Sequence, residues 1–322
     1  MVIETGIRSG ARGKEAGSRP DAVHLTATIL ENVPIARATY LLRLAAPAIA
    51  RSILPGQFVM VRPTAAGSDD PLLGRPLALY DVVRSGGGEP EALDLVYLVV
   101  GRGTAALSRR QPGERLSVWG PLGNGFGEPP AGPVIFVAGG IGQTPFLALG
   151  RWWLGRASYG TMERATKGPG PGPGLRRTAS SATLLYGVRT AEFLAGLEDF
   201  QSAGIEIEVA TDDGSAGYRG WVTDLLARRF ERGERPARVV GCGPPLMLAT
   251  LARLTGRHGI ACDVSLENHM ACGFGACFSC VAPIRQPDGS LDLRRLCVEG
   301  PVVSAAEVEW TRLIDGPDGA SS

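Results

Sequence analysis

Lysine, surplus charge of one sign and long apolar runs are all scarce in this 322-residue sequence. Only Lys14 and Lys167 among the 33 basic residues are lysine, and 32 acidic residues leave a formal net charge of +1. A chain without surplus charge offers no electrostatic argument for binding nucleic acid. No apolar run reaches the roughly 18–20 residues that a membrane-spanning helix needs. We therefore expect a chain that binds neither nucleic acid nor a membrane.

Residues 1–21 are polar and glycine-rich, and they lack the apolar segment of a secretory signal. We interpret them as a disordered tail. Cysteine is sparse over most of the chain, since only Cys242 and Cys262 lie outside one short stretch near the C-terminal end. This distribution argues against a disulfide framework and favours a reducing, cytoplasmic compartment.

The remaining cysteines follow the spacing C-x4-C-x2-C-x16-C, at Cys272, Cys277, Cys280 and Cys297. A C-x4-C-x2-C run with a distant fourth cysteine is typical of plant-type [2Fe–2S] clusters. Gly273 and Gly275 would let the loop wrap closely around the cluster. A structural zinc site more often has two C-x2-C knuckles, and only one is present here. The spacing predicts a [2Fe–2S] cluster, with zinc on the same four cysteines as the alternative.

Residues 22–130 contain short segments of alternating apolar and polar residues, divided by glycine- and proline-rich turns. Six of these segments are predicted strands, at 24–31, 38–44, 57–62, 76–83, 94–99 and 115–119. One short helix is expected at 103–108. Six strands within about 100 residues predict a small antiparallel barrel.

From residue 131 to 262 the pattern changes to strands that alternate with helices. Strands are predicted at 134–138, 182–186, 205–211, 238–241 and 261–266, and helices at 144–153, 190–200, 221–229 and 245–254. This rhythm predicts a parallel sheet with a ligand at the carboxyl ends of its strands. Residues 159–181, which contain a Gly-Pro repeat, are expected to form a disordered insertion. Residues 263–310 would form a small cluster domain, followed by a tail at 311–322.

Two motifs in the predicted barrel are suited to phosphate. Arg75, which precedes Pro76, Leu77 and Ala78, can make a bidentate contact to a phosphate. Gly103 and Thr104 lie in a glycine-rich turn at the start of the expected helix, where main-chain N–H groups can cradle an anion. An exposed arginine alone would carry little weight. The combination of both motifs with the cysteine loop is much rarer.

The first strand of the predicted sheet leads into Gly139, Gly140, Gly142 and Thr144. This G-G-x-G turn resembles a phosphate-binding loop, but it differs from the G-x-G-x-x-G dinucleotide fingerprint. Ordinary packing between strand, loop and helix is therefore the alternative interpretation.

A later strand ends at Cys242, Gly243 and Pro244. Cys242 either lies beside a bound nicotinamide or is a small buried thiol. Asp212 and Asp213 follow the third strand, where carboxylates accept hydrogen bonds from ribose hydroxyls and repel a 2′-phosphate. This position favours NAD over NADP.

Taken together, these motifs resemble the ferredoxin–NADP reductase superfamily, and within it the electron-transfer subunits of class 1B dihydroorotate dehydrogenases. The resemblance spans about residues 22–310. It implies an FAD-binding barrel, an NAD-binding domain and a C-terminal [2Fe–2S] domain with the four cysteines as ligands. The implied FAD contacts are Arg75, Pro76, Leu77, Ala78, Val96, Tyr97, Leu98, Gly103 and Thr104. Family members usually have serine where this chain has Ala78, so one hydroxyl contact to the flavin is missing.

The resemblance also implies a function. An FMN-containing partner subunit would oxidise dihydroorotate to orotate for pyrimidine biosynthesis, and electrons would pass from FMN through [2Fe–2S] and FAD to NAD⁺, in a complex with two copies of each subunit. FAD is needed between the [2Fe–2S] cluster and NAD⁺ because a flavin can exchange electrons either singly or in pairs. Two alternatives stay open. One is a subunit of a ferredoxin-dependent NAD(P)H oxidoreductase, sulfide dehydrogenase or hydrogenase, and the other is a non-enzymatic docking protein stabilised by zinc.

Overall fold

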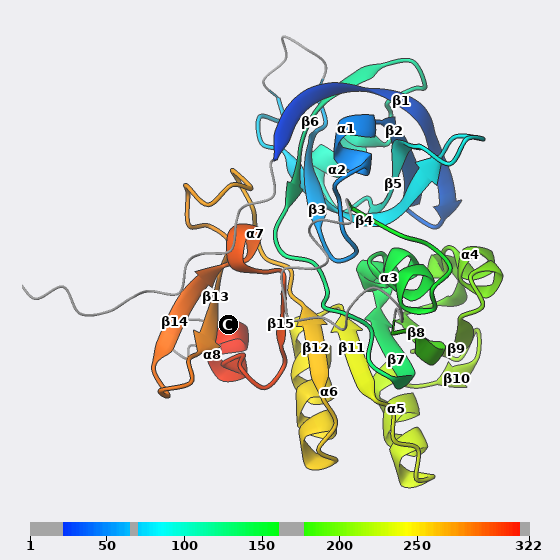
Figure 1. Ribbon diagram of the computed structural model, residues 1–322, viewed down its shortest axis with the longest axis vertical. Coiled ribbons are helices and arrows are strands. Elements are labelled where there is room, and N and C mark those ends of the chain that lie inside the picture. Colours follow the sequence, from blue (N-terminus) through cyan, green and yellow to red (C-terminus); the bar gives the residue numbers. More distant parts are fainter. Residues whose placement is uncertain (1–21, 65–69, 161–176, 316–322) are drawn as a thin grey trace, which may run out of the picture.

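The computed structural model describes residues 22–64, 70–160 and 177–315. Figure 1 shows a barrel at the top, an α/β sheet below it and a smaller module at the left that contains the C-terminal elements. No helix in these ranges combines the length and the apolar character needed to cross a bilayer.

The barrel is closed and has six antiparallel strands in the order β1-β2-β5-β4-β3-β6, which confirms the predicted fold of this part. Its strands are β1 (Val23–Ala36), β2 (Thr39–Ala45), β3 (Phe58–Arg62), β4 (Arg75–Arg84), β5 (Pro90–Leu98) and β6 (Arg115–Leu122), with the short helices α1 (Pro47–Ala50) and α2 (Arg102–Leu107). Alternate residues of β2 are buried, because successive side chains of a strand point to opposite faces. The inward set, including Leu42, Leu44, Leu93 and Leu95, fills the barrel.

The second domain is a seven-stranded sheet in the order β10-β9-β8-β7-β11-β12-β15. Its strands are β7 (Gly132–Gly139), β8 (Ala179–Val188), β9 (Glu206–Thr211), β10 (Tyr218–Arg219), β11 (Arg238–Cys242), β12 (Cys262–Ser265) and β15 (Val302–Ser304). All neighbours are parallel except β12 and β15. The helices are η1 (Gly140–Gln143), α3 (Phe146–Trp153), η2 (Ala191–Phe193), α4 (Leu197–Ser202), α5 (Val222–Glu231) and α6 (Pro245–Arg257). The predicted parallel α/β domain is therefore confirmed.

The helix predicted at 190–200 is wrong. The chain forms a single 3₁₀ turn, η2, and then a separate helix, α4. Between them Gly196 adopts a left-handed conformation with φ +71°, which ends one helical segment and starts another. A side chain at Gly196 would also meet the hydroxyl of Tyr80 on the barrel, so this turn is shaped by a tertiary contact that propensity does not reveal.

The expected insertion at 159–181 is too wide at both ends. Tyr159 is buried against the barrel, and Ala179 already belongs to β8. The Gly-Pro repeat and the rest of 161–176 lie outside the described residues, as do the predicted tail at 1–21 and residues 316–322. The predicted tail at 311–322 begins too early, because α8 (Trp310–Asp315) is a helix that packs on α6.

The C-terminal module is less separate than the predicted boundary at 262/263 implies. That boundary falls inside β12, and β15 from the C-terminal module completes the same sheet. The module adds the hairpin β13 (Val281–Arg285) and β14 (Leu291–Arg295) and the short helix α7 (Leu296–Glu299). Its cysteine loop is thus anchored to the edge of the nucleotide sheet.

Candidate functional site

A cavity of about 310 Å³ opens where the barrel, the sheet and the C-terminal module meet. The barrel contributes β4, β5 and Thr104, the sheet contributes Ile141, Thr144, Pro145 and Cys242, and the C-terminal module contributes Ser265, Leu266, Glu267, Asn268, Met270 and Pro301. One space is therefore shared by three parts of the chain that lie far apart in the sequence.

Eight of the nine residues predicted to contact FAD line this cavity: Arg75, Pro76, Leu77, Ala78, Val96, Tyr97, Leu98 and Thr104. The ninth, Gly103, supports the guanidinium of Arg75. A β-carbon built on Gly103 would lie only 2.3 Å from Nε of Arg75, so any larger residue would push the arginine away. Nη1 of Arg75 donates to the carbonyl oxygens of Leu73 (2.7 Å) and Gly74 (3.1 Å). The arginine is held beside the cavity without a carboxylate partner among the described residues, which fits a phosphate ligand.

Several of these residues turn their side chains away from the cavity. The ring of Tyr97 stacks on Tyr40 inside the barrel, and its hydroxyl donates to Asn32. The hydroxyl of Thr104 accepts the N–H of Val100 (2.9 Å) and so holds the turn in place. With alanine at position 78, the strands offer mainly main-chain groups and apolar surface, which is the lining expected for a flat aromatic ring system.

The two predicted nucleotide loops lie side by side at the carboxyl ends of β7 and β11. Ala138 is paired with Cys242 in the parallel register. A β-carbon on Gly142 would lie 2.2 Å from the carbonyl oxygen of Cys242, so this glycine is required for packing between the loops. Packing between the loops therefore explains why position 142 is glycine. Gly140 differs, because it has φ +57° and a β-carbon built on it would have no atom within 4 Å. The open position, Gly140, is the one where a ligand can approach the main chain.

The remaining predicted NAD residues divide into those that face the cavity and those that do not. Thr144 and Cys242 line it. Gly139, Gly243, Pro244, Asp212 and Asp213 are outside its lining, at the carboxyl edge of the sheet.

The two aspartates at this edge differ in their partners. The carboxylate of Asp213 accepts hydrogen bonds from the hydroxyl (2.6 Å) and the N–H (2.9 Å) of Ser215, which lower its pKa. The carboxylate of Asp213 thus stabilises the turn between Asp213 and Ser215. The carboxylate of Asp212 makes no hydrogen bond or ion pair within the described ranges, which leaves it available for a ribose.

Sequence reasoning missed the contribution of the residues just before the cysteine loop. Glu267 lines the cavity, and desolvation there raises the pKa of its carboxyl group. Burial, followed by the charge of Glu267, raises the pKa of the Cys242 thiol, while a hydrogen bond with Ser265 opposes the rise. The carboxyl group of Glu267 and the thiol of Cys242 therefore lie together on one wall of the cavity. Only the fold brings positions 242 and 267 together.

The four cysteines of the predicted cluster belong to the C-terminal module, whose residues Glu267 and Met270 line this cavity. Cys280 and Cys297 are buried, Cys272 is half-buried and Cys277 is exposed. Hydrogen bonds from Ser279, and then from Cys272, lower the pKa of Cys277 to about 6. Burial, with the neighbouring thiols of Cys280 and Cys272, raises the pKa of Cys297 to about 12.

These interactions link Cys272 with Cys277, and Cys297 with both Cys280 and Cys272. Within the described part of the chain, no three His, Cys, Asp or Glu side chains come together as a site for a single metal ion. Four thiolates with this spacing are the ligand set of a plant-type two-iron cluster. The donor set therefore favours the [2Fe–2S] prediction.

The cysteine loop is fastened to the barrel by hydrogen bonds and close contacts. Nε1 of Trp119 donates to the carbonyl oxygen of Cys272 (3.0 Å). The main-chain N–H of Gly123 donates to the carbonyl oxygen of Cys297 (3.1 Å). A β-carbon on Gly273 would lie 2.5 Å from Cγ of Met60, so the loop lies directly on β3. The thiols are thus held against the barrel wall that also borders the cavity.

A barrel joined to a parallel sheet, with a ligand cavity at the junction and a four-thiol loop beside it, defines a flavin-dependent pyridine-nucleotide oxidoreductase that also carries an iron–sulfur cluster. The structure described as an NADH-dependent reduced ferredoxin-NADP oxidoreductase is similar to it, with a TM-score of 0.70 and 26% identity over 90% of this chain and 91% of that one. The Amycolatopsis cytochrome P450 reductase shares the fold over 74% of this chain and 67% of its own, with a TM-score of 0.56 and 25% identity.

The family model for the iron-sulfur cluster binding domain of dihydroorotate dehydrogenase B matches residues 267–309. The dihydroorotate dehydrogenase B (NAD(+)) electron transfer subunit of Desulforamulus reducens is 35% identical over 88% of this chain and 97% of its own length. Its homolog from Aquifex aeolicus is 33% identical over 88% and 98%. The chain belongs to this family of electron transfer subunits. It is an oxidoreductase subunit, and FAD, a [2Fe–2S] cluster and NAD are its cofactors.

Proposed function

We propose that this chain is the NAD-linked subunit of a cytoplasmic dihydroorotate dehydrogenase of pyrimidine biosynthesis, in a complex with two copies of each subunit. It would take electrons from an FMN-containing catalytic subunit and deliver them to NAD⁺. The observation that carries the proposal is the position of the cysteine loop, whose neighbours Glu267 and Met270 line the same cavity as the predicted FAD contacts. Bound FAD supplies the exchange between single electrons and hydride that such a chain requires.

The side chains and the main chain have separate roles in this proposal. Arg75, supported by Gly103, would hold the FAD phosphates, and the main chain of β4 and β5 would hold the flavin ring. Cys272, Cys277, Cys280 and Cys297 would ligate the cluster. Thr144 and Cys242 face the cavity and would border the nicotinamide, whereas Asp212 would accept from a ribose.

The surface around the cysteine loop supports a partner contact there. Phe274 and Phe278 are 58% and 59% exposed, and Cys277 between them is exposed as well. The guanidinium of Arg295 lies 5.0 Å from the centroid of the Phe278 ring. Exposed aromatic side chains beside an arginine are enriched at protein interfaces. Docking at this surface would bring the partner's flavin close to the cluster.

Co-expression with the candidate catalytic subunit tests the proposal. The purified complex is expected to contain iron, FAD and FMN, and to reduce NAD⁺ when dihydroorotate is added. Size measurement by sedimentation should give two copies of each chain. Activity only with fumarate or a quinone as acceptor would contradict the proposal, and colourless protein containing zinc but no iron would favour the docking-protein alternative.

The preference for NAD over NADP has its own test, because a ferredoxin-dependent NAD(P)H oxidoreductase is the second candidate. Replacing Asp212 by Ser removes the carboxylate that would repel a 2′-phosphate. The kcat/KM ratio for NADH over NADPH should then fall by about tenfold, equivalent to about 1.4 kcal/mol. Asp213→Ser is the nearby comparison, and it should disturb the turn at Ser215 rather than the coenzyme ratio. A wild type that prefers NADPH would favour the second candidate.

A further inference from the structure

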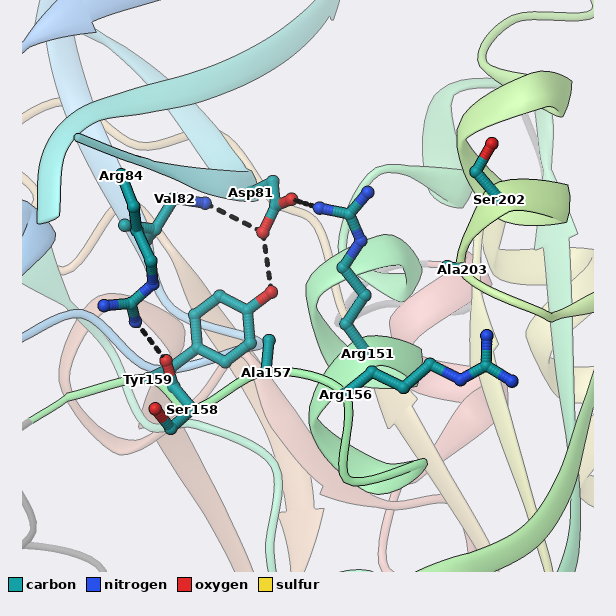
Figure 2. Close-up of a pocket in the computed structure, with 10 residues that line it drawn as sticks. All are labelled: Asp81, Val82, Arg84, Arg151, Arg156, Ala157, Ser158, Tyr159, Ser202 and Ala203. Carbon is teal, nitrogen blue, oxygen red and sulfur yellow. Dashed lines mark hydrogen bonds and ion pairs between the residues drawn. The ribbon is translucent and has the colours of Figure 1, made fainter. Parts of the chain in front are cut away.

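We propose that a second cavity, between the barrel and the α/β domain, binds a small phosphate monoester. This cavity has a volume of about 560 Å³ and is separate from the flavin cavity, with which it shares no lining residue. Figure 2 shows its walls: Asp81 and Arg84 come from β4, Arg151 from α3, Arg156 from the segment after α3, and Ser202 from the end of α4. Nothing in the proposed electron path uses it.

One carboxylate in the cavity is fully engaged. Oδ1 of Asp81 accepts from the hydroxyl of Tyr159 (2.6 Å) and from the N–H of Val82 (2.9 Å), and its other oxygen pairs with Arg151. Burial raises the pKa of Tyr159, so that its hydroxyl stays protonated as a donor. Asp81 therefore neutralises Arg151 and no other arginine of the cavity.

The positive charges of Arg84 and Arg156 remain uncompensated within the described residues. Arg84 donates only to carbonyl oxygens, those of Gly88 (3.0 Å) and Ser158, which orient its guanidinium without cancelling its charge. The main-chain N–H of Arg156 donates to the carbonyl oxygen of Arg151 (2.8 Å), but its guanidinium forms no hydrogen bond or ion pair within those residues. Two fixed cations facing one space, with no anion of the protein opposite them, favour a ligand with about two negative charges.

Arg156 is nevertheless held in place. Its guanidinium packs against Gly204, which follows shortly after the end of α4. A β-carbon built on Gly204 would lie 2.2 Å from both Nη atoms of Arg156. This contact places the guanidinium, which is exposed to solvent, at the mouth of the cavity. An arginine that is positioned by a glycine and lacks an acidic partner has the preorganisation of an anion-binding residue.

The volume of the cavity and its uncharged lining residues indicate the size and character of the rest of the ligand, beyond its anionic group. A cavity of about 560 Å³ lies within the usual range for small-molecule sites and is larger than an inorganic ion requires. Ser158 and Ser202 offer hydroxyl groups, and Val82, Ala157 and Ala203 offer small apolar surfaces. Guanidinium groups match phosphate oxygens in a bidentate geometry. A phosphate monoester of a sugar carries about two negative charges, and its sugar is small enough for the rest of the cavity to hold.

Titration of the holoprotein with ribose 5-phosphate tests this site. The full chain, loaded with FAD and cluster, is titrated by calorimetry in saturating NAD⁺, so that the nucleotide site is blocked. Saturable binding of one ribose 5-phosphate per chain is expected, and ribose should not bind. Arg156→Gln should weaken binding by about tenfold or more, because a charged bidentate contact is lost. Arg232→Gln, at another exposed arginine whose guanidinium has no hydrogen-bond partner among the described residues, is the matched control and should leave binding unchanged.

Flavin absorbance and circular dichroism establish that each variant is folded, and Arg84→Gln gives a second variant on the opposite wall. Absence of saturable binding to wild type overturns the site. Equal affinity of wild type and both cavity variants overturns the assignment to this cavity. A dicarboxylate such as malonate that binds as tightly as ribose 5-phosphate overturns the ligand class.

Discussion

The barrel meets the C-terminal module and the α/β domain through seams of different character. The cluster seam, formed by Trp119, Gly123 and Asn124 with the C-terminal module, relies on main-chain acceptors and direct packing. The side-chain amide of Asn124 donates to the carbonyl of Val302 (2.7 Å) and accepts the N–H of the same residue (2.9 Å). This pairing copies the hydrogen bonding between two strands.

The sheet seam has apolar packing too, with Tyr80 against Phe200 and Phe126 against Trp153, but its polar contacts are pairs of side chains. The hydroxyl of Tyr80 donates to Asp199 (2.7 Å), Arg151 pairs with Asp81, and Arg37 pairs with Glu192 at the surface. Exposed ion pairs contribute little to stability because water screens them. The main-chain contacts of the cluster seam suit the proposed function, since the rate of electron transfer depends steeply on distance.

The largest expected effect comes from Cys277→Ser, which removes one proposed cluster ligand beside the cluster seam. Reduction of NAD⁺ through the partner should be abolished. Oxidation of NADH with an artificial acceptor should partly survive, because the flavin cavity and the sheet are untouched. Stopped-flow kinetics on both reactions checks this. If both activities disappear while the protein stays folded and keeps its FAD, the two seams do not serve separate functions.

Asn124→Ala should have the second largest effect. It removes two side-chain hydrogen bonds and leaves the N–H and C=O of Val302 unpaired, so about 2–3 kcal/mol of stabilisation of the cluster seam should be lost. The expected result is a lower iron content and slower reduction of the cluster by NADH. Iron analysis and the visible spectrum measure both. An unchanged rate and iron content would show that packing alone holds the loop.

Tyr80→Phe makes the matched change in the sheet seam and should have the smallest effect. Burial raises the pKa of Tyr80, so it is a neutral donor to Asp199 and its loss removes one hydrogen bond. About 1–2 kcal/mol should be lost, seen as a small fall in thermal midpoint. Cluster content should not change. A fall in iron content as large as that of Asn124→Ala would remove the distinction between the seams.

The cysteine spacing and the strand rhythm could be interpreted without a structure because both are local. Three of the predicted cluster ligands lie within nine residues, and β7 and β11 each show an apolar run. The helix expected at 190–200 could not be corrected in this way, because a contact between Gly196 and Tyr80 decides that turn. The width of the predicted insertion was wrong for the same reason, since Tyr159 is ordered by Asp81 on β4.

The sequence by itself determined the kinds of chemistry that this protein can hold: thiolates at cluster spacing, an arginine before a strand, and glycine turns after strands. These three features depend only on residue type and on short spacing, both of which can be read from the sequence. Only the tertiary structure decided that Glu267 borders the same cavity as Arg75, that Asn124 pairs with Val302, and that Arg84 and Arg156 face one space. Such relations arise when surfaces distant in the sequence pack together, and no local pattern encodes them.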